Sequence, residues 1–277
     1  MKVVAALRDG PNLTNVRTEA LTEGLETHGY SVKKIGRGEV VKGADLFIQT
    51  GFAGSNALRS AIDQRIPYIV MEAPFWRDFY DVHEASSWGY NGLAGGAWVP
   101  EAPDKERHRP PLKPMKAGTG PTIIIGQKPT DHSLRGSNHV KWILDVRAEL
   151  PEADFRPHPL MVPQDTMEPI QSTLEKYWQV VTYTSTVGCE ALVEGCKVRA
   201  DHPANLAYGV REDDREQWHL GLAWRQAWHS DFGALVPYIL SGYDEARARA
   251  REGLLEHPRE KVRDTVQEQA YYQLLGG

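Results

Sequence analysis

The chain has 277 residues, with 32 lysines and arginines against 37 aspartates and glutamates, and a formal charge of −5. This length allows one large domain or two small ones, and the 41% hydrophobic and 25% charged residues argue against extensive disorder. Two cysteines are too few for a disulfide framework, and no stretch approaches the roughly 20 apolar residues that span a bilayer. We therefore expect a cytoplasmic protein that does not associate with membranes. The mild acidity excludes a chain that is basic throughout, although not one with a local basic groove.

The first third alternates short apolar runs with helical periodicities. Strands are predicted over residues 2–7, 30–35, 44–49 and 68–72, and helices over 15–28 and 55–65. Strands that alternate with helices of this length indicate βαβ units and a largely parallel sheet.

Residues 74–120 interrupt this alternation. Their first part is rich in aromatic residues, which predicts a loop packed on the domain. Residues 100–121 combine prolines and charges without periodicity, which is typical of a linker. We predict a domain boundary within this stretch.

The alternation then resumes. Strands are predicted over residues 122–126, 154–158, 179–183 and 196–200, and helices over 140–150, 170–178, 185–194, 212–228 and 235–252. The polar remainder also favours a helix. The predicted organisation is an N-terminal α/β domain over residues 1–110, a second α/β domain over 111–250 and a helical tail over 251–277.

Ligands of doubly wound sheets bind beyond the carboxyl ends of the strands, so the loops at these ends are the candidate sites. In one of them, a strand leads through Thr184, Ser185 and Thr186 into a helix. Hydroxyls and free amides at a helix start suit an anion such as phosphate, and Glu190 is placed to accept hydrogen bonds from ribose. A plain helix cap with a solvated Glu190 is the alternative.

Two further strand ends carry polar groups. Gln127 and Lys128 follow a strand, where a lysine can meet a phosphate and a glutamine can contact a base or sugar. An exposed turn explains the same residues equally well. His158 lies between two prolines at the end of the next strand, although a lone histidine is more often structural.

In the first domain, a general base has to be a carboxylate or a histidine at a strand end. The residues that meet this condition are Asp9, Glu72, Asp78, Asp81 and His83. Several familiar fingerprints are missing from the chain: there is no zinc-ligand spacing, GxGxxG, GxxxxGK[ST] or GxSxG.

Taken together, these segments resemble the GT-B glycosyltransferases, whose fold has two Rossmann-like domains facing each other across a cleft. The resemblance is carried by GQKPTDHS after the first strand of the second domain, RPHP after its second, and TYTSTVGCEALVEGCKV. The nearest types are the bacterial capsule-polysaccharide transferases and the related enzymes of tailed phages. MEAPFWRDFYDVHEASSWGYNGLAGG and LAWRQAWHSDFGALVPYILSGY add to a resemblance that covers most of residues 65–243.

The resemblance implies a nucleotide-sugar donor such as UDP-glucose, held by the second domain without a metal or other cofactor. The residues that it places at the donor are Gln127, Lys128, Asp131, Arg156, His158, Ser185, Thr186 and Glu190. The first domain is then expected to bind the acceptor and supply the base, with Asp78 or Asp81 favoured and Asp9 next.

Similarity to the phage enzymes suggests a hydroxymethylated pyrimidine in double-stranded DNA as the acceptor, in the cytoplasm of a bacterial host. Flipping such a base requires a positive groove and a surface to stack on. The residues expected to contact it are Phe75, Trp76, Arg77 and Tyr80. The alternatives are a polysaccharide, lipid-linked or small-molecule acceptor, or a protein that binds nucleotide-sugars without catalysis.

Overall fold

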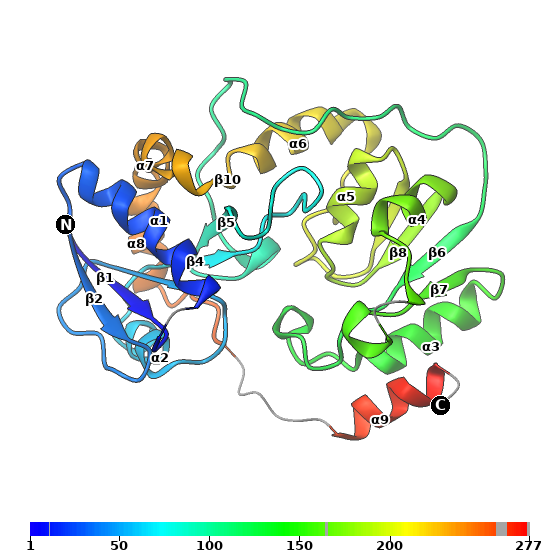
Figure 1. The fold of residues 1–277 in the computed structure, drawn as a ribbon, viewed down its shortest axis with the longest axis horizontal. Helices are drawn as coiled ribbons and strands as arrows, with labels where there is room; N and C mark the ends of the chain where they lie inside the picture. Colours follow the sequence, from blue (N-terminus) through cyan, green and yellow to red (C-terminus); the bar gives the residue numbers. More distant parts are fainter. Residues whose placement is uncertain (11, 164–165, 259–264, 276–277) are drawn as a thin grey trace. The chain divides into compact units, whose positions relative to one another are not determined.

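The computed structural model is a mixed α/β protein with two sheets, which confirms the predicted fold class at that level (Figure 1). It describes residues 1–10, 12–163, 166–258 and 265–275. These residues form two compact units: unit 1 contains those within 1–109 and 217–260, and unit 2 those within 110–216 and 261–277. Within the described ranges, no helix has both the length and the apolar character needed to cross a membrane.

Unit 1 has a six-stranded sheet in the order β10-β5-β4-β3-β1-β2. Its strands are β1 (Lys2–Leu7), β2 (Ser31–Gly36), β3 (Leu46–Thr50), β4 (Tyr68–Glu72), β5 (Ala85–Tyr90) and β10 (Gln226–Trp228). The first four run parallel to one another. β5 is antiparallel to its neighbour β4, and β10 is antiparallel to β5, so β10 runs in the same direction as the first four. Val3 in β1 lies opposite Val32 on one side and Leu46 on the other, so β1 is a central strand.

Helices cover both faces of this sheet, which is why β1 is a continuous apolar run rather than an alternating one. They are α1 (Leu13–Thr27), α2 (Asn56–Asp63), α7 (Phe232–Ser241) and α8 (Tyr243–Arg251), with 3₁₀ turns η1 (Ala94–Gly96) and η6 (His229–Asp231). Val3 belongs to the core cluster that includes residues of α1 and α7, whereas Val4 belongs to the cluster that includes residues of α2. A Cβ on Gly24 of α1 would lie 3.1 Å from the Gly233 nitrogen of α7, so the two helices touch through their backbones.

Two strands of unit 1 differ from the sequence-based expectation. Residues 85–90 were expected in a loop but form β5, and residues 226–228 were expected in a helix but form β10. The six residues of β5 include two serines and a glycine, which have little preference for strands. Both strands owe their conformation to pairing within the sheet, where Ala227 lies opposite Ser86.

The division of the chain also differs from the predicted one. Residues 217–250 were assigned to the second domain, but β10 pairs with β5 and α7 packs on α1, which places them in unit 1. The connection is α6 (Arg215–Ala223), which starts in unit 2 and ends in unit 1. The helix predicted over 235–252 is interrupted at Gly242, where a Cβ would lie 2.8 Å from the Trp98 ring.

Unit 2 has a four-stranded parallel sheet in the order β7-β6-β8-β9. Its elements are β6 (Thr122–Ile125), β7 (Asp154–Arg156), β8 (Gln179–Thr182), β9 (Lys197–Ala200), α3 (His139–Glu149), α4 (Ile170–Lys176), α5 (Val187–Val193), α9 (Thr265–Leu274), η2 (His132–Leu134), η3 (Pro159–Met161) and η5 (Glu212–Asp214). Ile123 and Ile125 share a core with residues of α4 and α5. Ile124 faces the opposite side of the sheet, where α3 contributes Val146.

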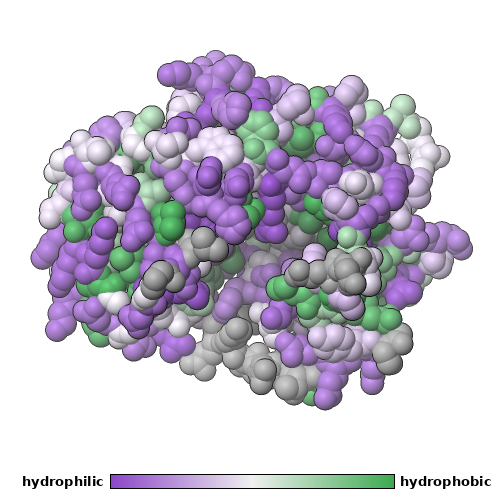
Figure 2. Space-filling view, in the orientation of Figure 1, coloured by the Kyte–Doolittle hydropathy of each residue, from purple (hydrophilic) through white to green (hydrophobic). Residues whose placement is uncertain are grey.

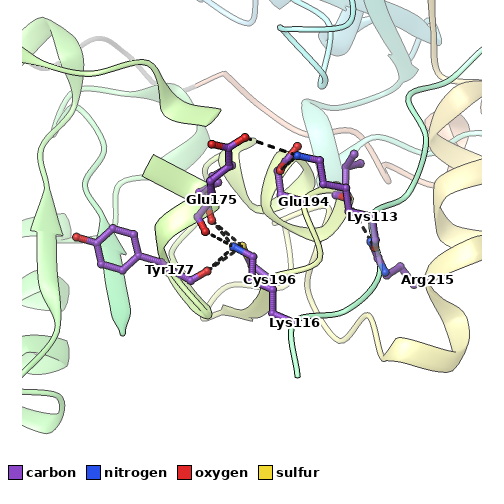
Figure 3. Close-up of polar contacts among 9 residues, drawn as sticks. Lys113, Lys116, Glu175, Tyr177, Glu194, Cys196 and Arg215 are labelled. Atoms are coloured by element: carbon purple, nitrogen blue, oxygen red, sulfur yellow. Dashed lines mark hydrogen bonds and ion pairs between the residues drawn. The ribbon is translucent and has the colours of Figure 1, made fainter. Parts of the chain in front are cut away.

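Residues 113–116, expected within a linker, are fastened to unit 2 (Figure 3). The Lys113 amide donates to the Val193 carbonyl, and the Lys113 ammonium lies 2.6 Å from Glu194. The Lys116 ammonium donates to the carbonyls of Leu174 and Tyr177, near the carboxyl end of α4, where the helix dipole favours a cation. The expectation of a free linker is therefore wrong for these residues.

The exposed large apolar side chains are scattered along the sequence, from Val16 through Leu160 to Val266. The face drawn in Figure 2 is mostly hydrophilic, with apolar residues dispersed among polar ones. This surface agrees with the charged fraction of the composition.

Candidate functional site

The topology of unit 2 marks one point of its sheet for ligand binding. After β6 the chain continues to β7 on one side, and it then returns to β8 on the other side of β6. The connections that leave β6 and β8 therefore run in opposite directions, which in doubly wound sheets leaves a crevice at the carboxyl ends of the two strands. Gln127 and Thr184 follow these two strands by two residues each.

The Gln127 side chain bridges the two strand ends. Its Oε1 accepts from the Thr184 backbone N–H at 2.8 Å, and its Nε2 donates to Thr184 Oγ1 at 2.9 Å and to Ser133 Oγ at 3.1 Å. Gln127 and Thr184 are both buried. The amide of Gln127 is therefore used within the protein, where it positions the loop after β8. Its contact with a donor stays a prediction.

His139 and Asp131 fix the loop after β6. The Gln127 N–H donates to Nε2 of the buried His139 at 2.8 Å, which requires a neutral imidazole with its proton on Nδ1. Burial lowers the pKa of His139 to about 4, the effect of Asp131 acting in the opposite direction. Asp131, expected at the donor, accepts from the Ser133 N–H at 2.8 Å and so caps η2.

Asn205 is a residue of this site that the sequence did not reveal. It is buried in the segment after β9, and its Nδ2 donates to the carbonyls of Tyr183 at 3.0 Å and Ser185 at 3.3 Å. The loop after β8 is thereby held from both sides, by Gln127 and by Asn205. A single asparagine in an irregular segment carries no motif, so only its contacts reveal this role.

Aromatic rings line the same edge of the sheet. The Tyr183 ring lies 5.0 Å from the His202 ring and 5.4 Å from the Trp142 ring, measured between centroids. The Tyr183 hydroxyl donates to Ser137 Oγ at 2.8 Å, and Trp142 Nε1 donates to Asp201 at 3.0 Å. Half-buried rings of this kind offer stacking faces, while their polar atoms are bonded within unit 2.

Two of the residues expected at the donor have partners that explain their position without a ligand. The Arg156 guanidinium donates to Thr173 Oγ1 and to the Glu168 carbonyl, so it anchors the start of α4. The His158 Nδ1 accepts from the Leu160 N–H at 3.1 Å, which caps η3. These contacts favour structural roles for both side chains.

The remaining expected donor residues follow β6 or β8 in the chain or lie on α5. Lys128 and Thr186 are half-buried, and the Lys128 ammonium has neither a hydrogen bond nor an ion pair with another described residue. Ser185 Oγ accepts from the Val187 N–H at 3.2 Å, and Glu190 is buried on α5. The Lys128 ammonium is therefore available to a phosphate.

The three candidate bases of unit 1 are all exposed. Asp9 is the second residue after β1, and its Oδ1 lies 3.9 Å from the position of a Cβ on Gly36 at the end of β2. Asp81 Oδ1 accepts from the His83 N–H at 2.7 Å, an arrangement that stabilises a turn. Asp9 therefore shares the carboxyl edge of the parallel strands, whereas Asp78 and Asp81 lie in the loop between β4 and β5.

The aromatic residues expected to contact the acceptor are buried, and only Arg77 of that group is exposed. The Trp76 ring lies 4.6 Å from the His219 ring, and the Tyr80 ring lies 5.1 Å from the Trp228 ring. The Tyr80 hydroxyl donates to the His108 carbonyl, and burial raises its pKa to about 12. Phe75, Trp76 and Tyr80 thus fill the interior of unit 1 and present no face on which a base can stack, contrary to the expectation.

The buried His139 makes the stability of unit 2 depend on pH. Its pKa rises from about 4 in the folded protein to an ordinary value on unfolding, so the unfolded chain binds more protons between these values. The free energy of unfolding should be highest above pH 6.5 and should fall by roughly 3 kcal/mol as the pH drops to 4. Urea titrations at several pH values measure this loss. The variant H139Q keeps an acceptor for the Gln127 N–H, and its free energy of unfolding should fall much less over the same pH range. If it falls as much as that of the parent, His139 is not the group responsible for the pH dependence.

No family model matches this sequence, and no curated protein matches it either. Solved structures do. The beta Kdo 2,4 transferase of Thermosulfurimonas dismutans KpsC is 17% identical and has a TM-score of 0.51, with 85% of this chain and 97% of that chain covered. The beta Kdo 2,7 transferase of the same protein is 14% identical, also with a TM-score of 0.51, and covers 82% of this chain and 92% of that chain. The likeness is one of fold. At these identities it shows a shared architecture and leaves the chemistry to the residues described above.

Proposed function

We propose that this chain is a glycosyltransferase that binds a nucleotide-sugar at the crevice of unit 2 and transfers the sugar to a hydroxyl of a saccharide. The observation that carries the proposal is the fold shared with two sugar transferases over more than four-fifths of the chain. The crevice between β6 and β8 supports it, since doubly wound sheets bind nucleotides at such a point.

In this reaction, the acceptor oxygen forms a bond to the anomeric carbon while the bond from that carbon to the phosphate oxygen breaks. The nucleotide leaves with the bonding electrons, and a carboxylate takes the acceptor proton if the sugar is inverted. The Lys128 ammonium is suited to neutralise charge on the leaving phosphate, and the hydroxyls of Ser185 and Thr186 are suited to donate hydrogen bonds to its oxygens. The candidates for the base are Asp9, Asp78 and Asp81.

A saccharide acceptor is favoured over a hydroxymethylated base in DNA for two reasons. The transferases that share the fold are named for 2,4 and 2,7 linkages of Kdo, and such number pairs name the positions at which two sugars are joined. The aromatic rings that a flipped base would need are buried in unit 1. A modified DNA duplex is therefore kept as a comparison in the experiment and not as the expected acceptor.

The experiment measures binding of UDP, CMP and GDP to the full chain by calorimetry. At least one nucleotide is expected to bind, and K128Q should weaken that binding about tenfold, because a charge-assisted contact to phosphate is lost. The matched control is K141Q, since Lys141 is exposed on α3 and is paired with Asp145. Absence of binding by all three nucleotides would contradict the proposal.

Transfer is then measured with the nucleotide-sugars of the nucleotide that binds. Turnover that rises with an oligosaccharide acceptor and is indifferent to hydroxymethylated duplex DNA is the expected result. Turnover that rises with the hydroxymethylated DNA and is indifferent to the oligosaccharide would show that DNA is the acceptor. The proposed donor site would be unaffected by that result.

A further inference from the structure

Unit 1 contains a second point at which neighbouring parallel strands continue in opposite directions. The chain leaves β1 for β2 on one side and later returns to β3 on the other side of β1. Three arginines belong to this edge: Arg8 follows β1, Arg37 follows β2, and Arg17 lies on α1. We call Arg8, Arg17 and Arg37 the arginine cluster.

The strand ends hold the cluster in a defined place. The position of a Cβ on Gly51, directly after β3, is 3.7 Å from Arg37 Nη2 and 4.0 Å from Glu72 Oε1 at the end of β4. Arg17 reaches the loop after β4, where its Nη2 donates to the Val82 carbonyl at 2.8 Å. The guanidiniums of Arg17 and Arg37 therefore lie over the carboxyl ends of β3 and β4, and not in free solvent.

The charges of the cluster are poorly compensated by the protein. No carboxylate of the described residues forms an ion pair within 4.0 Å of Arg8, Arg17 or Arg37. Asp9 and Glu39 lie on the same edge, beside Gly36, and the Glu39 carboxylate accepts from the Gly36 N–H. The cations are thus close to acidic groups without being paired to any of them.

Burial and repulsion by a neighbouring cation both lower the pKa of Arg17 and Arg37. Burial lowers the pKa of Arg37 to about 10, with a further lowering by Arg8, while Glu72 raises it. Burial also lowers the pKa of Arg17, where Glu72 acts in the raising direction and Arg77 in the lowering one. Arg8 is therefore near Arg37, Arg77 is near Arg17, and Glu72 is near both Arg17 and Arg37.

Two donors of the cluster are left over. The Nε atoms of Arg17 and Arg37 are buried and have no acceptor among the described residues. A buried cation without a partner destabilises a fold, and so does a buried donor without an acceptor. A bound anion at this edge of the sheet would compensate the charges of Arg17 and Arg37 and would accept hydrogen bonds from their Nε atoms.

We infer that the arginine cluster of unit 1 is a binding site for an oxyanion, either a carboxylate or a phosphate, at the junction of β1 and β3. The planar guanidinium fork matches the oxygen pairs of both groups. That this anion is carried by the acceptor sugar rests on the proposed function, whereas the binding of the anion does not.

The test uses the full chain with glucuronate, glucose 6-phosphate and neutral glucose at constant ionic strength, and it reads the melting temperature. At ten times the dissociation constant, a bound anion should raise the melting temperature by roughly 3 °C, and glucose should not. A shift with glucuronate alone assigns a carboxylate, and one with glucose 6-phosphate alone assigns a phosphate. A shift of equal size with both assigns a general oxyanion site. Absence of any shift up to about 50 mM of either acid would overturn the inference.

Variants locate the site. R17Q and R37Q should each remove the shift, whereas K34Q, at an exposed lysine of β2, should keep it. Without added anion, R37Q should melt at the same temperature as the parent or higher, because an unpaired cation has been removed. A lower melting temperature of R37Q without anion, together with an unchanged shift, would make the cluster purely structural. Nucleotide binding is measured on the same variants, which separates this site from the donor crevice. If the parent binds no nucleotide, the proposed function is contradicted, but a melting-temperature shift with the anion still supports the anion site.

Discussion

Replacement of Gln127 by leucine is expected to lower the free energy of unfolding of unit 2 by about 3 kcal/mol, because it leaves several buried polar groups without partners. Leucine has nearly the same size but cannot accept from the Thr184 N–H or donate to Thr184 Oγ1 and Ser133 Oγ. The loop after β8 then loses one of its two anchors and keeps only Asn205. We expect nucleotide binding to fall with it, since this loop forms one wall of the crevice.

The matched control is Q179L, at the opposite end of β8. Gln179 is half-buried, and its Oε1 accepts one hydrogen bond, from Thr122 Oγ1 at 3.2 Å. This variant should cost less than about 1 kcal/mol and leave nucleotide binding unchanged. Urea titration and calorimetry on the two variants make the comparison. Equal losses in both would show that Gln127 has no special place at the strand ends, and unchanged stability of Q127L would refute the bridging role itself.

The second large effect is expected at Gly195, where alanine should destabilise unit 2 by about 4 kcal/mol or more. Gly195 has a positive φ of +76°, which disfavours a side chain. In addition, a Cβ would lie 2.1 Å from the Pro114 carbonyl oxygen and 3.0 Å from its carbon. These are backbone atoms of the segment that Lys113 and Lys116 fasten to unit 2, so relief of the clash requires this segment to move.

A substitution at Gly209 separates the cost of the positive φ from the cost of the clash with Pro114. It lies in the same unit with a φ of +70°, but no atom lies within 4 Å of its Cβ position. G209A should therefore cost only the conformational penalty, about 1–2 kcal/mol, and chemical denaturation of both variants gives the difference. If G195A and G209A lose the same amount, the contact with residues 113–116 contributes nothing, and those residues are a linker after all.

The local pattern was enough to identify the parallel part of the fold. β1, β3 and β4 are apolar runs followed by turn residues, and α1 and α2 are separated from them by short connections, so each element is specified by its own residues. β5 and β10 are different, since ASSWGY and QAW prefer no strand by themselves. They are strands because their hydrogen bonds are made with each other and with β4, at positions far apart in the chain.

In the candidate site too, local pattern identified some features and contacts between distant segments decided the others. The loops after β6 and β8 were recognised from strand ends rich in polar residues, and the structure joins them directly through Gln127 and Thr184. The sequence did not reveal that the Gln127 amide is bonded to Thr184 and Ser133, because an amide that faces a ligand and one that faces a neighbouring loop look identical in one dimension. Asn205 was missed for a related reason: its partners lie about 20 residues away, on a different loop.

The sequence by itself determined that the chain forms α/β units with parallel strands, and that polar loops follow those strands. These properties depend on the order of apolar and polar residues over short distances, which fixes the hydrogen bonding of each element. Only the tertiary structure decided which unit residues 217–250 join, which aromatic rings are buried, and which arginines lie together without an ion pair to a carboxylate of the described residues. These properties depend on contacts between segments far apart in the chain, where burial and electrostatic energy are set by neighbours that a linear pattern does not specify.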